Sequence, residues 1–169
     1  MSRAITTPCA VNKATLTATQ YHLHTRFSPI LGHNGAPRKN GKQTMFSHVM
    51  LGVNDLEISK KFYDALLATL GIGPGIANKN RYFYRSATGT FGITTSVNGE
   101  AAFHGNGSTI GFNMQSPEQA DAFHAAGVAN GGTTCEDPPG FREGPAGQLY
   151  LAYLRDPDGN KICALHRPR

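Results

Sequence analysis

Residues 150–166 read YLAYLRDPDGNKICALH, and this stretch decides the fold. Two apolar, strand-like runs flank Asp-Pro-Asp-Gly at positions 156–159. Pro157 presets the φ angle of a turn, and Gly159 supplies a positive φ without steric cost. The stretch therefore predicts a β-hairpin.

A second informative segment, residues 46–71, reads FSHVMLGVNDLEISKKFYDALLATLG. It predicts a strand that leads directly into a helix. Asn54 is a suitable N-cap, with Glu57 three residues later as in a capping box. Gly71 is expected to end this helix. The predicted core-facing stripe consists of apolar residues four positions apart: Ile58, Phe62, Leu66 and Leu70.

The chain repeats this pattern at an offset of 61 residues, which places HVMLGV at 48–53 over TIGFNM at 109–114. In the second copy Ser116 is the expected N-cap and Pro117 the first helical residue. Gln119 completes the capping box. Ala120 and Phe123 are predicted to face inward, and Gly127 or Gly131 to end the helix. The strands expected after the helices are residues 81–86, 91–97, 132–135, 149–155 and 161–166.

Together these segments resemble the vicinal oxygen chelate superfamily of glyoxalase I, bleomycin-resistance proteins and extradiol dioxygenases. The resemblance covers residues 45–169. It implies an α+β fold in which two tandem βαβββ units form a curled mixed sheet around one pocket.

The resemblance also implies metal ligands on the first and last strands of each unit. His48 occupies the first of these positions. Thr109 stands where a second His is usual, and Cys163 where a Glu is usual. The fourth position falls near Ile93 or Thr94, neither a good ligand. We therefore expect an incomplete site, with no cofactor or a weakly bound divalent metal at His48, for which Zn is the best match.

Strand alternation then predicts which residues share the pocket. Met50 lies on the same face as His48, Asn113 on that of Thr109, and Tyr153 on that of Leu151. We predict catalytic roles for His48 and Tyr153. The predicted ligand-binding residues are Met50, Thr109, Asn113, Arg142, Leu151 and Cys163.

Arg142 lies in residues 135–148, CEDPPGFREGPAGQ, which has three prolines and three glycines. This segment predicts a long loop, either a surface loop without a role or a lid over the pocket. Arg142 is its single cation. It would pair with a ligand carboxylate or phosphate, or at the surface with Glu143 or Glu136.

Charge divides the chain into two parts. Residues 1–44 contain six basic and no acidic residues, whereas residues 45–169 contain 10 basic and 11 acidic residues. We interpret residues 1–44 as a disordered basic N-terminal extension, with a flexible arm, a cloning or start-site extension and an organellar presequence as the alternatives. The near-neutral remainder argues against nucleic-acid binding.

Other bulk properties narrow the class further. No apolar run is long enough to span a membrane. Three scattered cysteines without a CxxC pair argue against a disulfide framework and favour a reducing compartment. We expect a cytoplasmic homodimer, or an organellar one if residues 1–44 are a presequence.

Two functions follow from these features. One is a lyase- or isomerase-like enzyme acting on a small metabolite, with His48 as base or ligand. The other is a resistance-type protein that sequesters a small molecule without chemistry.

Overall fold

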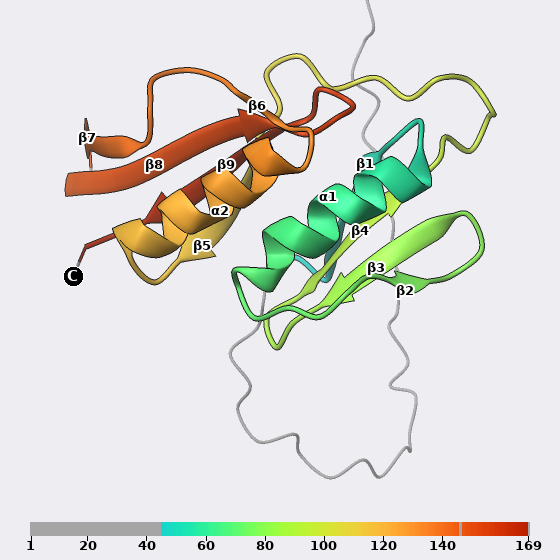
Figure 1. Cartoon of the computed structure of the whole chain (residues 1–169), viewed down its shortest axis with the longest axis horizontal. Coiled ribbons are helices and arrows are strands. Elements are labelled where there is room, and N and C mark those ends of the chain that lie inside the picture. Colours follow the sequence, from blue (N-terminus) through green and yellow to red (C-terminus); the bar gives the residue numbers. More distant parts are fainter. Residues whose placement is uncertain (1–44, 146, 169) are drawn as a thin grey trace, which may run out of the picture. The chain divides into compact units, whose positions relative to one another are not determined.

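The computed structural model describes residues 45–145 and 147–168, so the prediction for residues 1–44 lies outside the described part. Two successive units, each beginning strand–helix, make up this part (Figure 1). The first unit contains β1 (His48–Gly52), α1 (Leu56–Ala68), β2 (Ile76–Ala77), β3 (Arg81–Arg85) and β4 (Thr90–Thr94). The second contains β5 (Ile110–Met114), α2 (Pro117–Ala129), β6 (Thr133–Thr134), β7 (Gly140–Gly144), β8 (Gly147–Arg155) and β9 (Lys161–His166). The α+β class and the internal repeat are confirmed.

The strands form two separate mixed sheets. The first has the order β1-β4-β3-β2, and the second the order β5-β9-β8-β6, with β7 paired to β8. In each sheet the first strand runs parallel to the last one, and the remaining pairs are antiparallel. The prediction was a single curled sheet, whereas the structure has one sheet in each repeat.

The segment predicted as a long loop or lid contains a strand instead. Residues Gly140–Gly144 form β7, which pairs antiparallel with β8 from Gly140 opposite Leu151 to Gly144 opposite Gly147. The glycines and Arg142 of this segment are not typical of a strand, so the sequence alone does not predict one. The strand forms because β8 extends back to Gly147 and pairs with it. The prediction of a loop throughout residues 135–148 is therefore wrong.

Both helices begin with a side-chain cap, although the first cap differs from the prediction. Asp55, not Asn54, is the N-cap of α1, and its carboxylate accepts hydrogen bonds from Glu57 N and Ile58 N. Ser116 caps α2 as predicted, accepting from Gln119 N. The Gln119 side chain in turn accepts a bond from Gln115 N at 2.8 Å.

The buried face of α1 also differs from the predicted stripe. Ile58 is 54% exposed, whereas the buried side chains are Ser59, Phe62, Tyr63, Leu66 and Leu67. Members of this set lie three or four positions apart (59 and 62, 62 and 66, 63 and 67), which follows the helical period of 3.6 residues more closely than steps of four alone. Ala120 and Phe123 of α2 are fully buried, as predicted.

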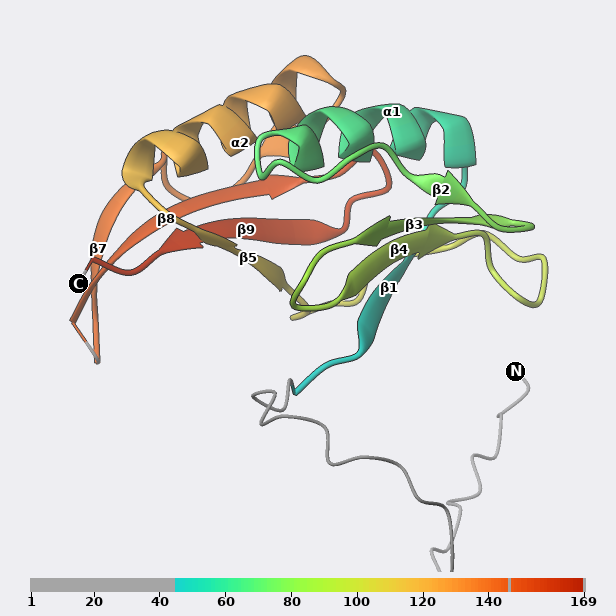
Figure 2. The ribbon, with the colours of Figure 1, turned by 90° about the horizontal axis from the view of Figure 1, so that it is seen from below.

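The two helices cover one side of both sheets and leave the other side without helices (Figure 2). A chain of aromatic rings runs through the core between the helix layer and the sheets. Ring centres lie 4.8 Å apart for Tyr63 and Phe91, 5.5 Å for Phe91 and Phe112, and 5.4 Å for Phe112 and Phe123. This chain joins the repeats through a shared apolar core.

The predicted DPDG turn connects β8 to β9, and it also binds the first repeat. Asp158 Oδ1 accepts hydrogen bonds from Asn54 N (2.9 Å) and Asn54 Nδ2 (2.8 Å). Its Oδ2 accepts one from Ser59 Oγ at 2.9 Å. Tyr63 OH donates to Asp156 Oδ2 at 2.7 Å, and Asn160 Nδ2 donates to Gly52 O at 3.1 Å. We call residues 156–160, bound in this way, the latch.

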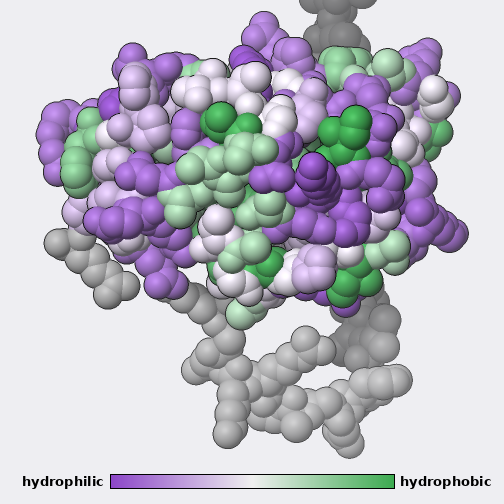
Figure 3. Space-filling view, in the orientation of Figure 1, coloured by the Kyte–Doolittle hydropathy of each residue, from purple (hydrophilic) through white to green (hydrophobic). Residues whose placement is uncertain are grey.

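The outer surface of the helix layer is mainly polar, with small apolar patches between polar side chains (Figure 3). Neither α1 nor α2, the helices of the described part, has the length and apolar character needed to cross a membrane.

Candidate functional site

Strand register places the predicted pocket residues of the first sheet on its helix-free side. Phe91 and Ile93 of β4 are buried beneath the helices, and they pair with Val49 and Leu51 of β1. The alternate residues therefore face away from the helices. On β1 and β4 these are His48, Met50 and Gly52, and Thr90, Gly92 and Thr94.

The second sheet follows the same rule. Ala152, Leu154, Ile162 and Ala164 are fully buried under α2. Their neighbours Leu151, Tyr153 and Cys163 therefore point to the helix-free side. Asn113 pairs with Leu165 and shares this face. Each predicted pocket residue on a strand thus lies on the face that alternation predicts.

The repeat relates four positions that the family resemblance assigns to metal ligands. The pair Gly111–Cys163 of the second sheet corresponds to the pair Met50–Gly92 of the first. The fourth position is therefore Gly92, and the expectation of Ile93 or Thr94 is wrong. Ile93 has the opposite parity and is fully buried.

These four positions do not fit a resident divalent ion. They hold His48, Thr109, Cys163 and Gly92, so only His48 and Cys163 could bind a metal ion, fewer than the three protein ligands that a catalytic site needs. A Cβ atom at Gly92 would lie 2.5 Å from Met50 Sδ, which shows that Met50 fills the space. Nowhere in residues 45–145 and 147–168 do three His, Cys, Asp or Glu side chains gather in a metal-binding arrangement.

His48 lines two cavities. One, the inter-repeat cavity of about 370 Å³, lies between the N-terminal ends of β1 and β4 and the β5–α2 junction. Asn113, Gln115 and Gln119 contribute polar groups to it, and its apolar lining includes Phe91 and Phe112. The other, which we call the Arg85 cavity, has a volume of about 440 Å³ and is lined by Ser47, His48, Phe83, Arg85 and Thr90.

Thr109 lines a third cavity, of about 280 Å³, together with Arg155, Lys161 and the loop 104–108. We call it the Arg155 cavity. The prediction placed His48, Asn113 and Thr109 in one pocket. The structure brings His48 and Asn113 together in the inter-repeat cavity and places Thr109 in the Arg155 cavity.

Tyr153 and Cys163 face each other across β8 and β9. Burial raises the pKa of the Tyr153 hydroxyl, and the neighbouring Cys163 adds to this shift. Burial also raises the pKa of the Cys163 thiol. Both groups are therefore protonated at neutral pH, so neither is an activated nucleophile. The Lys161 ammonium lies 4.6 Å from the centre of the Tyr153 ring.

Arg142 lies on the helix-free face of β7, opposite Leu149 of β8. Its Nη2 donates to Pro138 O at 2.7 Å, and its Nη1 to Phe141 O at 3.2 Å. Asp137 Oδ2 lies 3.8 Å from its Nε. The alternatives of the prediction were Glu143 and Glu136, but the observed carboxylate partner is Asp137.

A family model for the Glyoxalase/Bleomycin resistance protein/Dioxygenase superfamily matches residues 45–164. The chain belongs to this superfamily. A glyoxalase/bleomycin resistance protein from Albidiferax ferrireducens T118 is 81% identical, with 73% of this chain and 100% of that chain covered and a TM-score of 0.72.

More distant structures share the fold of this glyoxalase-superfamily chain. A glyoxalase-related enzyme from Fulvimarina pelagi is 22% identical, with 75% of this chain and 90% of that chain covered and a TM-score of 0.58. A family enzyme from Burkholderia phytofirmans PsJN is 17% identical, with coverage of 71% and 96% and a TM-score of 0.55. No curated protein matches the chain significantly.

Sequence reasoning missed three cations on the helix-free faces, namely Arg85, Arg155 and Lys161, which line the cavities beside His48 and Thr109. A signal for them was present. Arg85 and Arg155 each end the penultimate strand of their repeat, so the repeat that located His48 and Thr109 also relates these two arginines.

Proposed function

We propose that this superfamily member binds a small metabolite at His48 and does so without a resident metal ion. The proposal rests on which residues occupy the four ligand-equivalent positions. His48 lines two cavities, while Thr109, Cys163 and Gly92 occupy the other three positions. A catalytic metal needs about three protein ligands, and this set does not supply them.

The lining of the inter-repeat cavity supports binding rather than covalent chemistry. Amide groups of Asn113, Gln115 and Gln119 lie near aromatic rings, a composition that is common in ligand sites. Among the described residues that line this cavity, His48 is the one titratable side chain. The protonated state of Cys163 gives no nucleophile on the neighbouring sheet.

A lyase- or isomerase-like activity is the second candidate. It is favoured by the exposure of His48 in both cavities, because an imidazole can exchange protons with a bound ligand near neutral pH. In that case His48→Ala would abolish turnover. In a binding protein the same change weakens binding, and the ligand is recovered unaltered.

Elemental analysis combined with a ligand screen tests the proposal. The protein, purified without chelators or a His-tag, is expected to carry well under one transition metal ion per chain. A library of small metabolites should contain compounds that raise the melting temperature. His48→Ala should reduce this rise, whereas His124→Gln in the helix layer serves as the matched control. Stoichiometric metal that is lost in His48→Ala would contradict the proposal.

Restoring ligands provides a gain-of-function check of the positions themselves. Thr109→His combined with Cys163→Glu would place two His and one Glu at ligand-equivalent positions. If the repeat aligns these positions around one site, this double variant will bind divalent ions more tightly than the natural chain in a competition assay with a metal indicator. Equal affinity in the two proteins would mean that the repeat does not align these positions around one site.

A further inference from the structure

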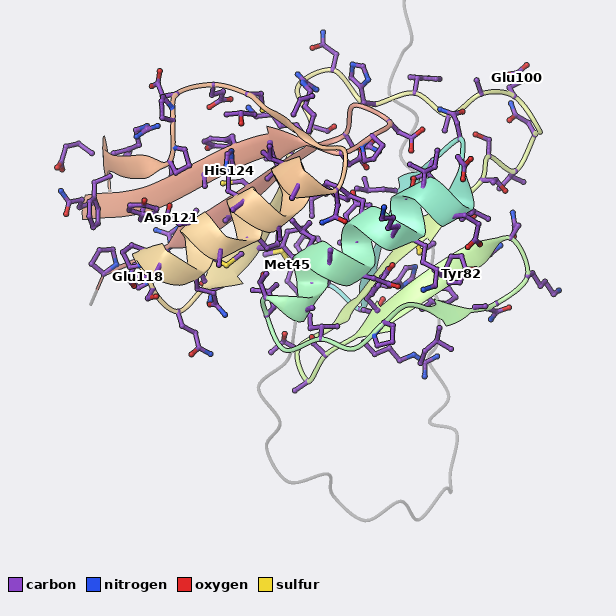
Figure 4. The ribbon with its side chains drawn as sticks, viewed as in Figure 1. Met45, Tyr82, Glu100, Glu118, Asp121 and His124 are labelled. Carbon is purple, nitrogen blue, oxygen red and sulfur yellow. The ribbon has the colours of Figure 1, made fainter. Side chains whose placement is uncertain are left out.

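The charged side chains of the two sheets are segregated by face. Five cations occupy strand positions on the helix-free faces: Arg81, Arg85, Arg142, Arg155 and Lys161. In the strands of the described part, no Asp or Glu shares these faces, because Glu143 lies opposite Gln148 and has the other parity. The other acidic residues of the described part lie in the helices and connections, as Glu118 and Asp121 do on α2 (Figure 4).

Three of these cations are not neutralised by a neighbouring carboxylate. Lys161 pairs with Glu136, and Arg142 approaches Asp137. Within residues 45–145 and 147–168, Arg81, Arg85 and Arg155 belong to no ion pair. Arg81 Nε is in addition buried without a hydrogen-bond partner in that part of the chain. Guanidinium groups with unused donors favour an anion as their partner.

The repeat places two of these arginines equivalently. Arg85 lies opposite Thr90, and Arg155 opposite Lys161, at the same corner of each sheet. Each arginine lines a cavity together with the residue at the first ligand-equivalent position of its repeat, His48 or Thr109. Each repeat therefore presents a cation at the edge of its helix-free face.

The Arg155 cavity is the better defined of the two. Arg155 Nη1 donates to Gly159 O at 2.6 Å, which fixes the guanidinium against the turn. The His104 ring lies over Gly159, since a Cβ atom there would come within 2.8 Å of His104 Nδ1. Thr109 adds a hydroxyl group, whereas the Ser108 hydroxyl donates to Gly105 O at 2.8 Å, and among the described residues that line this cavity none carries a carboxylate. A fixed guanidinium without an acidic partner, beside a hydroxyl group, forms a site for an oxyanion.

We propose that the Arg155 cavity binds a carboxylate or phosphate group, with Arg155 as its main cationic partner and Lys161, which it would share with Glu136, as a second contact. This inference goes beyond the proposed function, because it assigns a second cavity, separate from those at His48, and names the class of small molecule that this cavity takes: an anionic metabolite. Arg85 would provide the corresponding contact in the first repeat.

Titration of the full chain with inorganic phosphate and with succinate, followed by NMR, tests the inference. Arg155→Gln should weaken binding at least tenfold, and Lys161→Gln several-fold. Arg155→Lys should lie between Arg155→Gln and the natural chain, because it keeps the charge but loses the planar fork. Lys61→Gln removes an exposed cation from α1 and should leave binding unchanged. The preferred anion distinguishes a phosphate source from a carboxylate source.

Several outcomes would overturn the inference. These are no binding of either anion to the natural chain, equal weakening by Lys61→Gln and Arg155→Gln, or an unchanged affinity in both Arg155→Gln and Lys161→Gln. Tighter binding of a DNA oligonucleotide, weakened equally by all these variants, would indicate a macromolecular partner instead. Because the Lys161 ammonium contacts Glu136 and the Tyr153 ring, Lys161→Gln leaves the hydrogen bonds of the turn in place and remains informative even if Arg155→Gln folds poorly. The metal analysis above is independent of these results, so the two proposals can fail separately.

Discussion

The second repeat ties its last turn to the first repeat, whereas the corresponding turn of the first repeat faces a cavity. Asp156 and Asp158 of the latch bind Tyr63, Ser59 and Asn54. At the related positions the first repeat has Ser86–Gly89, whose Ser86 hydroxyl bonds only within its own turn. The inter-repeat cavity lies beside Ser86, Thr88 and Gly89.

The residues of the first repeat that bind the latch also differ from those at the equivalent positions of the second repeat. Residues 61 positions after Asn54, Ser59 and Tyr63 are Gln115, Ala120 and His124. Both partners of a polar contact have thus been replaced, and no buried carboxylate is left unpaired. A duplicated unit can therefore close one copy of an interface for stability and leave the other open for a ligand. The predictions below separate these two roles.

Breaking the latch should give the largest effect. Asp156 is 3% exposed, and its carboxylate accepts bonds from Tyr63 OH and from backbone and side-chain groups of residues 158 and 160. Asp156→Ala leaves these donors unpaired and should cost about 3 kcal/mol in unfolding free energy. This corresponds to a fall of about 10 °C in the melting temperature. Ser86→Ala, the matched change in the first repeat, should cost under about 1 kcal/mol. Equal losses would remove the distinction between the repeats.

The glycines that follow the two helices provide a second comparison. A Cβ atom at Gly132 would lie 2.9 Å from Arg155 O and 3.0 Å from Gly127 O, and these backbone atoms cannot move aside. Gly132→Ala should therefore cost about 2 to 3 kcal/mol. Its repeat counterpart Gly71 has a φ of 72° and open space around it, so Gly71→Ala should cost about 1 kcal/mol from backbone strain alone. Urea denaturation measures both, and a larger loss in Gly71→Ala would contradict the packing argument.

Substitutions in the cross-strand pairs on the helix-free faces should change the stability less. The first sheet combines Met50 with Gly92, and the second combines Gly111 with Cys163. Gly92→Ala meets the flexible end of Met50 and should cost about 1 kcal/mol, with much of it recovered when Met50→Ala is added. Gly111→Ala meets nothing within 4 Å and should change stability by under about 0.5 kcal/mol. A double-mutant cycle without coupling would show that Met50 does not fill the position.

Acid titration should show a smaller effect, in which one aspartate of each repeat, Asp64 or Asp156, changes the stability with pH in the opposite direction to the other. Burial raises the pKa of Asp156, although Asn160 and Tyr63 donate to it. For Asp64, burial alone would raise the pKa, but donors from Gly75, Lys60 and Tyr84 lower it overall. The Asp64 contribution to stability is therefore lost as pH falls through its lowered pKa, whereas that of Asp156 decreases as pH rises from the ordinary value to the raised one.

Asp64→Asn and Asp156→Asn, each compared with the natural chain over about pH 3 to 7, should show these slopes. The stability difference between the natural chain and Asp64→Asn should grow as pH rises. For Asp156→Asn the difference should shrink. Two slopes of the same sign would contradict the assignment.

Local signals in the sequence predicted most of the fold. Ser116-Pro117 located the start of α2, and the DPDG turn located β8 and β9, because caps and turns depend on a few adjacent residues. Strand alternation placed His48, Tyr153 and Cys163 on the helix-free faces. The prediction failed at Asn54, where a long-range bond to Asp158 competes with the capping role and Asp55 takes it.

The sequence by itself determined the duplicated α+β unit, the hairpin and the shared faces of the pocket residues on β1, β5, β8 and β9, since periodicity and turn chemistry are local properties. Only the tertiary structure decided that Gly92 is the fourth ligand-equivalent position, that β7 exists and that Thr109 and His48 line different cavities. These features depend on strand register and on the packing of one repeat against the other, and both are set by contacts between residues far apart in the chain. The segregation of Arg81, Arg85, Arg155 and Lys161 from the acidic residues has the same origin, because charges scattered along the sequence meet only when the strands pair.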